Sequence, residues 1–287
     1  MSFSLIHLSD PHFGAVADLA QIEAIEALVP DLEPEAVVLT GDLTLRARHG
    51  EFQRARAFVR ELARSAPVHV MPGNHDVQWW WRPFLPFGSA GKYRKYGRYF
   101  GPHLAPTLDL TDAVLVSVLT SHGVAWGSLT PRLRDIAVKG HLPKREIARA
   151  AARFAGARPE QVRVLVLHHN VLRGGLSDRM GLARWKTAQR RIVDSGADLV
   201  LCGHDHQEQA DTLDGVVVSC AGTVSTRSRG GRPAVFNRVV VDQDAIHLEY
   251  YRWEPDRKLF KRSDVHQFAR KRKAGVARDV EEVGAEG

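Results

Sequence analysis

Residues 3–12 read FSLIHLSDPH, and this stretch contains the pattern on which the fold of the chain depends. Phe3 to Leu8 is a short apolar run of strand type, and Asp10 and His12 follow directly after it. A carboxylate and an imidazole two residues apart can both turn toward one metal ion just beyond a strand end. The stretch therefore predicts a buried strand that delivers metal ligands.

Two further apolar runs repeat this arrangement in the next sixty or so residues. Ala36 to Thr40 precedes Gly41-Asp42, and Val68 to Met71 precedes Gly73-Asn74-His75-Asp76. Residues 19–28 and 51–62 between the runs have apolar side chains at helical spacing. Alternating strands and helices predict parallel βαβ units, in which functional side chains lie past the carboxyl ends of the strands. We expect Asp10, Asp42 and Asn74 to meet at one edge of a sheet.

The second half of the chain continues the alternation and then becomes all-β. Strands are predicted at residues 114–119, 162–167 and 199–202, and helices at residues 143–154 and 181–195. Three more strands are predicted at residues 216–220, 234–241 and 245–253. His168-His169 and Gly203-His204-Asp205-His206 follow two of these strands directly.

Composition places the chain among ordinary globular proteins. It has 287 residues, of which 44% are hydrophobic and 25% charged, and no apolar run approaches the roughly 20 residues that cross a bilayer. The metal motif lies so close to Met1 that we expect no export signal. The two cysteines, Cys202 and Cys220, lie in apolar runs, which predicts buried free thiols and a reducing, cytoplasmic location. The formal charge of +7 weakly favours an anionic partner, although a solvated basic surface explains it equally well.

The ligand types themselves limit the chemistry. Mixed oxygen and nitrogen donors suit Mn, Fe, Zn or Co better than Ca or Mg. Asp42 has two oxygens and can bridge two cations, while His204 and His206 would point the same way from an extended segment. Two such ions about 3.5–4 Å apart can clamp a phosphoryl group.

At this point the residues match a known family. Asp-x-His, Gly-Asp, Gly-Asn-His-Asp, His and Gly-His-x-His occur in order, so that the chain resembles the calcineurin-like metallophosphoesterases. Within them it is most similar to the bacterial class III cyclic-nucleotide phosphodiesterase group. Two stretches support this closer similarity. The first is Gly41-Asp42-Leu43-Thr44 with Glu51-Phe52 downstream, and the second is Ala221-Gly222-Thr223 followed by Ser225-Thr226-Arg227.

The resemblance implies a fold and a role for each ligand position. The fold would be an αββα sandwich of two mixed sheets flanked by helices, with the metal site at the carboxyl ends of the strands. Asp10, His12 and His206 would hold the first metal, Asn74, His168 and His204 the second, and Asp42 would bridge them. We expect two transition-metal ions, which would be Mn²⁺, iron (Fe²⁺ or Fe³⁺) or one of each, with Zn²⁺ or Co²⁺ as alternatives. His75 would face the substrate, and Asp76 could orient His75 through a hydrogen bond.

His168 and His169 are adjacent, and a regular strand end presents only one of two neighbours inward. The family pattern is commonly His-His-Pro with the first histidine as ligand, so we assign the metal to His168. Asn170 stands where proline is usual, and His169 therefore remains an alternative.

We expect one catalytic domain over residues 1–256, with an aromatic and basic insertion at residues 78–105 forming a cap over the site. Residues 257–287 are expected to form a partly basic tail that frays at its end. Arg82, Lys92, Arg94 and Arg227 could bind phosphate. Six aromatic residues of the insertion could stack a base: Trp79, Trp80, Trp81, Tyr93, Tyr96 and Tyr99. The alternative is that the aromatic rings pack a cap or a homodimer interface.

The leading hypothesis is a dinuclear phosphodiesterase that hydrolyses a small phosphodiester, such as a cyclic nucleotide, by attack of a metal-bridging hydroxide. A nuclease is a second hypothesis, motivated by the basic cluster at residues 271–273. A pyrophosphatase acting on a nucleotide-linked lipid precursor is a third, motivated by the tryptophans. A scaffold that keeps the fold without catalysis is the hypothesis from another class.

Overall fold

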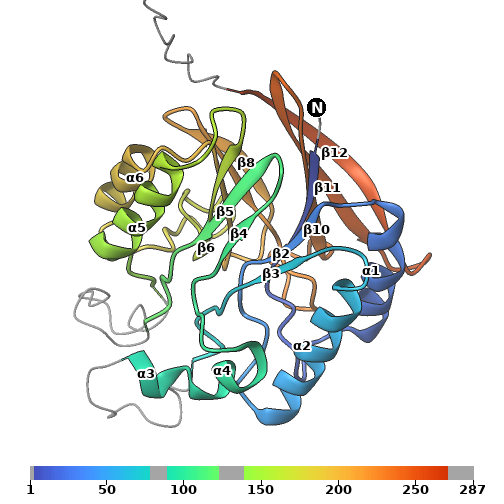
Figure 1. The fold of residues 1–287 in the computed structure, drawn as a ribbon. Coiled ribbons are helices and arrows are strands. Elements are labelled where there is room, and N and C mark those ends of the chain that lie inside the picture. The colour runs from blue at the N-terminus through green and yellow to red at the C-terminus, as the bar shows by residue number, and fades with distance from the viewer. Residues whose placement is uncertain (1–2, 78–88, 123–138, 271–287) are drawn as a thin grey trace, which may run out of the picture.

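The structure, a computed structural model, describes residues 3–77, 89–122 and 139–270. Two six-stranded sheets lie face to face, and helices cover the outer face of each (Figure 1). The αββα sandwich of two mixed sheets that the resemblance implies is confirmed.

The first sheet contains the amino-terminal strands at one edge and the last strand at the other. Its order is β12-β11-β10-β1-β2-β3. Strands β1 (Phe3–Leu8), β2 (Ala36–Leu39) and β3 (Val68–Val70) are parallel, as predicted from their alternation with helices. The three others run antiparallel to their neighbours: β10 (Val235–Val241), β11 (Ala245–Glu254) and β12 (Leu259–Ala269).

The second sheet has the order β4-β5-β6-β7-β9-β8. Its four central strands are parallel: β5 (Ala113–Ser117), β6 (Val162–His169), β7 (Leu199–Gly203) and β9 (Val216–Cys220). Two short antiparallel strands close its edges: β4 (Thr107–Asp109) and β8 (Gln209–Leu213).

Six helices are described. Helices α1 (Leu19–Asp31) and α2 (His49–Leu62) pack on the first sheet, while α5 (Lys144–Ala155) and α6 (Trp185–Asp194) pack on the second. The short helices α3 (Ser89–Lys92) and α4 (Arg94–Phe100) lie below the sheets in Figure 1. Among the described helices, none is long and apolar enough to cross a membrane.

Alternate residues of each strand enter different layers of the core, as the two-residue period of a strand requires. Leu5 and Val38 pack between the two sheets, whereas Ile6 and Val37 pack against α1 and α2. Strands that are buried on both faces read as continuous apolar runs. This explains why residues 3–8 and 162–167 could be recognised from their sequence.

The prediction that residues 257–287 form a tail is wrong for residues 259–269. Leu259 to Ala269 forms β12, which pairs with β11 from Ala245 to Glu254. Its outward side chains are mostly polar and exposed, because it is an edge strand. Its apolar pattern is therefore weak, and the domain extends at least to Ala269.

The predicted helix at residues 181–195 begins four residues late. Leu182 forms a bridge with Gly140, and Arg184 takes a left-handed conformation with a φ of 50° just before α6. These contacts hold residues 181–184 in an extended connection rather than in a helical turn.

Candidate metal centre

The predicted ligand residues meet at the carboxyl ends of both sheets. Asp10 follows β1, Asp42 follows β2 and Asn74 follows β3 in the first sheet. In the second sheet His168 is the next-to-last residue of β6, and His204 comes directly after β7. Parallel strands place their carboxyl ends at the same edge, which explains why segments so far apart in the sequence converge.

A first group of donors contains two carboxylates and two imidazoles. The Nε2 atoms of His12 and His206 are 2.9 Å apart, and the Oδ1 atom of Asp10 lies 3.3 Å from His206 Nε2 and 3.6 Å from His12 Nε2. The Oδ2 atom of Asp42 lies 3.9 Å from His12 Nε2. All four residues had been predicted as ligands from the sequence.

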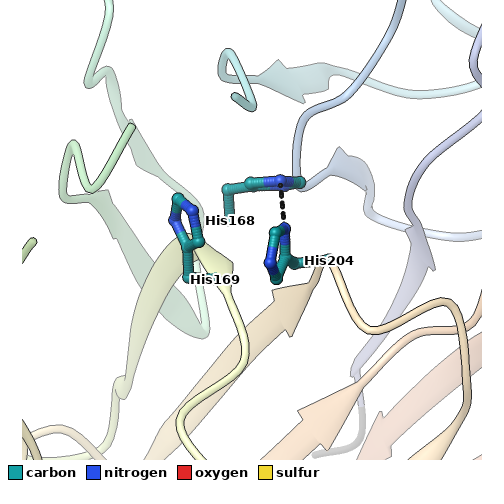
Figure 2. Close-up of side chains that lie close together, drawn as sticks. All are labelled: His168, His169 and His204. Atoms are coloured by element: carbon teal, nitrogen blue, oxygen red, sulfur yellow. Dashed lines mark hydrogen bonds between the residues drawn. The ribbon is translucent and has the colours of Figure 1, made fainter. Parts of the chain in front are cut away.

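A second group adjoins the first through Asp42. The Oδ1 atom of Asn74 lies 2.9 Å from His168 Nε2 and 3.0 Å from His204 Nδ1. Those two imidazole nitrogens are 3.3 Å apart, and Asp42 Oδ1 lies 3.4 Å from His168 Nε2. Figure 2 shows His168 and His204 turned toward each other from neighbouring strands.

These separations fit a metal ion in each group. Donors that are about 2.0–2.2 Å from a single transition metal lie about 2.8–3.6 Å from one another, and most of the distances above fall in this interval. Asp10 Oδ1 is buried and accepts no hydrogen bond from the described residues. Because an orphaned buried carboxylate oxygen is costly, a cation between Asp10, His12 and His206 would satisfy it.

Hydrogen bonds at the ring nitrogens that face away from the site orient the candidate histidine ligands. His168 Nδ1 lies 2.7 Å from the carbonyl oxygen of Thr40, and His206 Nδ1 lies 3.0 Å from that of Arg227. A carbonyl oxygen only accepts, so each Nδ1 carries a proton, and Nε2 is the nitrogen of each ring that faces the site. The other oxygen of Asp10 accepts from the Ser9 hydroxyl and from the His204 backbone amide.

The backbone is strained where the ligands gather. Five of the seven predicted ligands have a positive φ although none is glycine: Asp10, His12, Asp42, His204 and His206. Such a conformation costs of order 1–3 kcal/mol per residue and is typical of functional sites. Gly73 permits the close approach of these turns, since a Cβ there would lie 2.2 Å from Asp42 Oδ1.

The electrostatics favour the charge states that metal ligands need. Burial would raise the pKa of Asp42, but the neighbouring imidazoles of His168 and His75 hold it well below its usual value. Burial lowers the pKa of His12 to about 3 and that of His204 well below its usual value. His168 differs, because Asp42 and Asp10 outweigh burial and raise its pKa to about 9.

His75 is partly exposed and lies outside both donor groups. Its Nδ1 atom lies 2.8 Å from the carbonyl oxygen of Leu45, and its Nε2 atom lies 4.0 Å from Asp42 Oδ2. Its ring packs edge-on against His12, and its side chain is 19% exposed. It can therefore present one nitrogen to a molecule bound at the centre.

The expected hydrogen bond between Asp76 and His75 is wrong. Among the described residues, the buried Asp76 carboxylate accepts from the amides of Leu43, Thr44 and Gly73 and from the Thr44 hydroxyl. Burial and the nearby Asp42 raise the pKa of Asp76 to about 6. Asp76 thus ties the turn after β3 to the turn after β2, and it acts on His75 only through the backbone.

Glu51 is a supporting residue to which the sequence reasoning gave no role. Its carboxylate accepts hydrogen bonds from the amides of Arg46 and Arg48 at 2.8 and 3.1 Å, which forms a capping box at the start of α2. Leu45, whose carbonyl orients His75, lies in the same loop. An acidic residue three positions after the helix start is the sequence signal that identifies such a cap.

The predicted phosphate-binding residues are less well grouped. Arg82 and the three tryptophans at residues 79–81 lie outside the described residues. Lys92 Nζ donates to the carbonyl oxygen of His122, and Arg94 is exposed on α4. Arg227 is half-buried, and its carbonyl rather than its guanidinium contacts His206.

The tyrosines of the insertion pack within the protein. Tyr93 and Tyr96 are buried, and Tyr99 stacks on Phe52 of α2 with ring centroids 5.4 Å apart. For these three residues the packing alternative is the one that the structure supports. Tyr96 and Tyr99 anchor α4 on Phe52 of α2, while Tyr93 packs with Val77 and Leu119.

Taken together, the structure combines an αββα sandwich with two groups of candidate metal ligands at the carboxyl ends of its strands. Residues 3–208 match the calcineurin-like phosphoesterase family. The chain belongs to this family of hydrolases.

Two curated relatives are similar to this chain over about three quarters of its length. A cAMP/cGMP dual specificity phosphodiesterase of Mycobacterium tuberculosis is 26% identical over 76% of this chain and 66% of its own length. A probable cyclic nucleotide phosphodiesterase of Rhodococcus erythropolis is 26% identical over 76% of this chain and 70% of its own. The chain thus spans slightly less than two thirds of the mycobacterial relative.

Solved structures agree with the fold. A dimetal phosphatase from Danio rerio superimposes with a TM-score of 0.66 at 13% identity, over 94% of this chain and 99% of that one. A purple acid phosphatase from yellow lupin also gives 0.66 at 12% identity, over 94% of this chain and 54% of that one. At these identities the likeness concerns the architecture alone.

Proposed function

We propose that the chain is a dinuclear metal-dependent phosphodiesterase that hydrolyses a small phosphodiester, with a cyclic nucleotide as the leading candidate. The observation that carries this proposal is the position of Asp42 between the two donor groups. One of its oxygens lies 3.4 Å from His168 Nε2, and the other lies 3.9 Å from His12 Nε2. A single carboxylate can thus serve both ions, here proposed as Mn²⁺ and Fe²⁺ or Fe³⁺, with Zn²⁺ or Co²⁺ as alternatives.

Two cations bound there would lower the pKa of a water molecule and neutralise charge on a phosphodiester. The chain's own residues would supply the rest. His75 Nδ1 donates to the carbonyl oxygen of Leu45, and Nε2 is the ring nitrogen on the side of Asp42. As the bond from phosphorus to the water oxygen forms and the bond to the leaving oxygen breaks, protonated His75 would give its Nε2 proton to that leaving oxygen.

The class of substrate rests on weaker support. The two curated relatives named above are cyclic-nucleotide phosphodiesterases by name, and the same chemistry is proposed for this chain. Arg94 and Arg227, which keep some exposure, are proposed with Arg82 and Lys92 as contacts to the substrate's charge. A cytoplasmic location is also proposed, because both cysteines are free and buried. A homodimer is a separate proposal.

The scaffold hypothesis is disfavoured because the donor set is complete. All seven predicted ligands reach the centre, including both residues that contact His204 in the second group. A fold kept only for protein binding would not need five strained backbone positions at one edge.

A substrate panel tests the proposal. The purified protein is loaded with Mn²⁺ and assayed on bis(p-nitrophenyl) phosphate, 3′,5′- and 2′,3′-cyclic nucleotides, glycerophosphodiesters, nucleotide pyrophosphates and oligonucleotides. The proposal expects the highest kcat/KM on a small diester. Faster cleavage of single-stranded DNA would favour the nuclease, and faster cleavage of a pyrophosphate would favour the pyrophosphatase.

A further inference from the structure

His169 is a buried imidazole beside the second donor group, and the family pattern assigns it no ligand role. It is 1% exposed and ends β6 directly after the ligand His168. Neighbouring residues on a regular strand point to opposite faces. Its side chain should therefore have pointed away from the site.

A β-bulge explains why it does not. Val166 of β6 pairs with Leu201 of β7, and His169 pairs with Gly203, so β6 takes three steps where β7 takes two. The extra residue breaks the alternation, as bulges next to active sites do. Both histidines can then turn toward the same edge, and Figure 2 shows the rings of His168, His169 and His204 gathered there.

The three rings are close enough to share an ion. The centroid of the His169 ring lies 4.5 Å from that of His204 and 4.9 Å from that of His168. One ring nitrogen from each of the three residues lies within 4.8 Å of the others.

The far side of the His169 ring is held in place. Its Nδ1 atom lies 2.9 Å from the hydroxyl oxygen of Thr120, after β5. Gly140 leaves room for it, since a Cβ there would lie 2.4 Å from that same nitrogen. Thr120 and Gly140 thus fix the position of the His169 ring beside His168 and His204.

We propose that His169 is a third imidazole ligand of the second cation site, which makes that site richer in nitrogen than the first. The proposal rests on the proposed function, because it requires that two cations bind. The first group combines Asp10 and Asp42 with two imidazoles. The second shares only Asp42 and adds a neutral amide, Asn74, and three imidazoles.

This asymmetry predicts different metal preferences for the two sites. Two carboxylates favour a harder or more highly charged ion, such as Mn²⁺ or Fe³⁺, whereas imidazoles suit Zn²⁺, Co²⁺ or Fe²⁺. The second site should therefore take the softer ion when a mixture is offered. Removal of His169 should reduce this preference.

The test is metal binding by the full chain, measured apart from turnover. Metal-free wild type, His169→Ala and His169→Gln are titrated with Co²⁺ by calorimetry and by visible absorption, which reports the coordination of the ion. His141→Ala is the matched control, since this half-buried ring contacts His122 outside both donor groups. Circular dichroism checks that each variant is folded. If His169→Ala does not fold, His169→Gln provides the test, because glutamine keeps most of the volume of the side chain.

The proposal expects that wild type binds two ions and that both His169 variants lose at least about tenfold affinity at one site only. The absorption bands of that site should shift, while His141→Ala matches wild type. Wild-type affinities and spectra in both His169 variants would overturn the proposal, even if turnover fell. A wild-type protein that binds no transition metal would instead contradict the proposed function itself.

Discussion

The Nδ1 atom of His75 lies 2.8 Å from the backbone carbonyl oxygen of Leu45. This contact fixes the position of the proton on the ring and turns Nε2 toward the donor groups. Leu45 belongs to a loop that Glu51 holds from one side and Asp76 from the other. The geometry of His75 is therefore set by two buried carboxylates, of Glu51 and Asp76, that form no hydrogen bond with its ring among the described residues.

Replacement of His75 should slow the chemical step without emptying the metal sites. His75→Ala is expected to lower kcat by about 10²–10⁴, the range for loss of a positioned acid or base. Elemental analysis should still find wild-type metal content, because His75 lies outside both groups. His49→Ala replaces an exposed histidine at the start of α2 and is the control, which should keep full activity. Loss of metal in His75→Ala would mean that His75 is a ligand.

Replacement of Glu51 should loosen the Leu45 loop. Glu51→Ala removes two hydrogen bonds to a charged acceptor, and we expect a loss of about 1.5–3 kcal/mol in the free energy of unfolding. The pH profile of kcat should also change, since His75 loses its fixed orientation. Glu51→Gln keeps one acceptor oxygen and should recover part of both effects.

Glu61→Ala is the matched control for this experiment, because within the described part of the chain the Glu61 carboxylate pairs only with the exposed Arg64 one turn away. Surface pairs of this kind contribute little. Denaturant unfolding and a pH series of initial rates measure the two effects. If Glu51→Ala matched Glu61→Ala in both, Glu51 would have no role in positioning His75.

Buried His69 should make the fold sensitive to acid. It is 3% exposed, and its Nε2 lies 2.7 Å from the Ser117 hydroxyl of the opposite sheet. Burial lowers the pKa of His69 to about 4, below the value of about 6.5 in an unfolded chain. The unfolded state thus binds more protons between these pH values, so stability is complete above pH 6.5 and falls as the pH drops toward 4.

At 1.36 kcal/mol per pKa unit, this single group contributes on the order of 3 kcal/mol to that fall. Denaturant unfolding of wild type and His69→Gln at pH 7.5 and pH 5 measures it. The variant should lose less stability than wild type between the two pH values. His103→Gln, at an exposed position, should behave as wild type, and equal pH dependence in all three proteins would refute this prediction.

Metal removal should destabilise the protein. Five strained residues and a cluster of carboxylates surround the centre, and a bound cation compensates for both. An ion present at about 100 times its dissociation constant should add about 2.7 kcal/mol. Thermal unfolding with EDTA, and then with added Mn²⁺, should show a lowered and then restored Tm. A Tm that EDTA leaves unchanged in a protein freed of metal would speak against a metal centre.

Much of the centre could be predicted from the sequence because its ligands directly follow apolar runs. Strands such as β1 and β6 are buried on both faces, so their ends, and hence Asp10 and His168, were easy to place. The role of His169 could not be predicted, because a bulge depends on the pairing of β6 with β7 and has no signature in residues 162–169 alone. Strand β12 could not be predicted from the sequence, because one of its faces is exposed and polar.

The hydrogen-bond donors to the Asp76 carboxylate also could not be predicted from the sequence. A motif shows that Asp76 is adjacent to His75, but the amides of Leu43 and Thr44 approach its carboxylate only after β2 and β3 have paired. For the same reason the tyrosines of α4 resembled a nucleotide platform until their packing on Phe52 was known.

The most direct test of the account is the number of transition-metal ions per chain, measured by elemental analysis together with turnover of bis(p-nitrophenyl) phosphate, in wild type and Asp42→Ala. Asp42 lies between the two donor groups, with one oxygen toward each. The account predicts two ions per chain and turnover in wild type, and fewer than two ions and no turnover in the variant. Two ions and undiminished turnover in Asp42→Ala would contradict it.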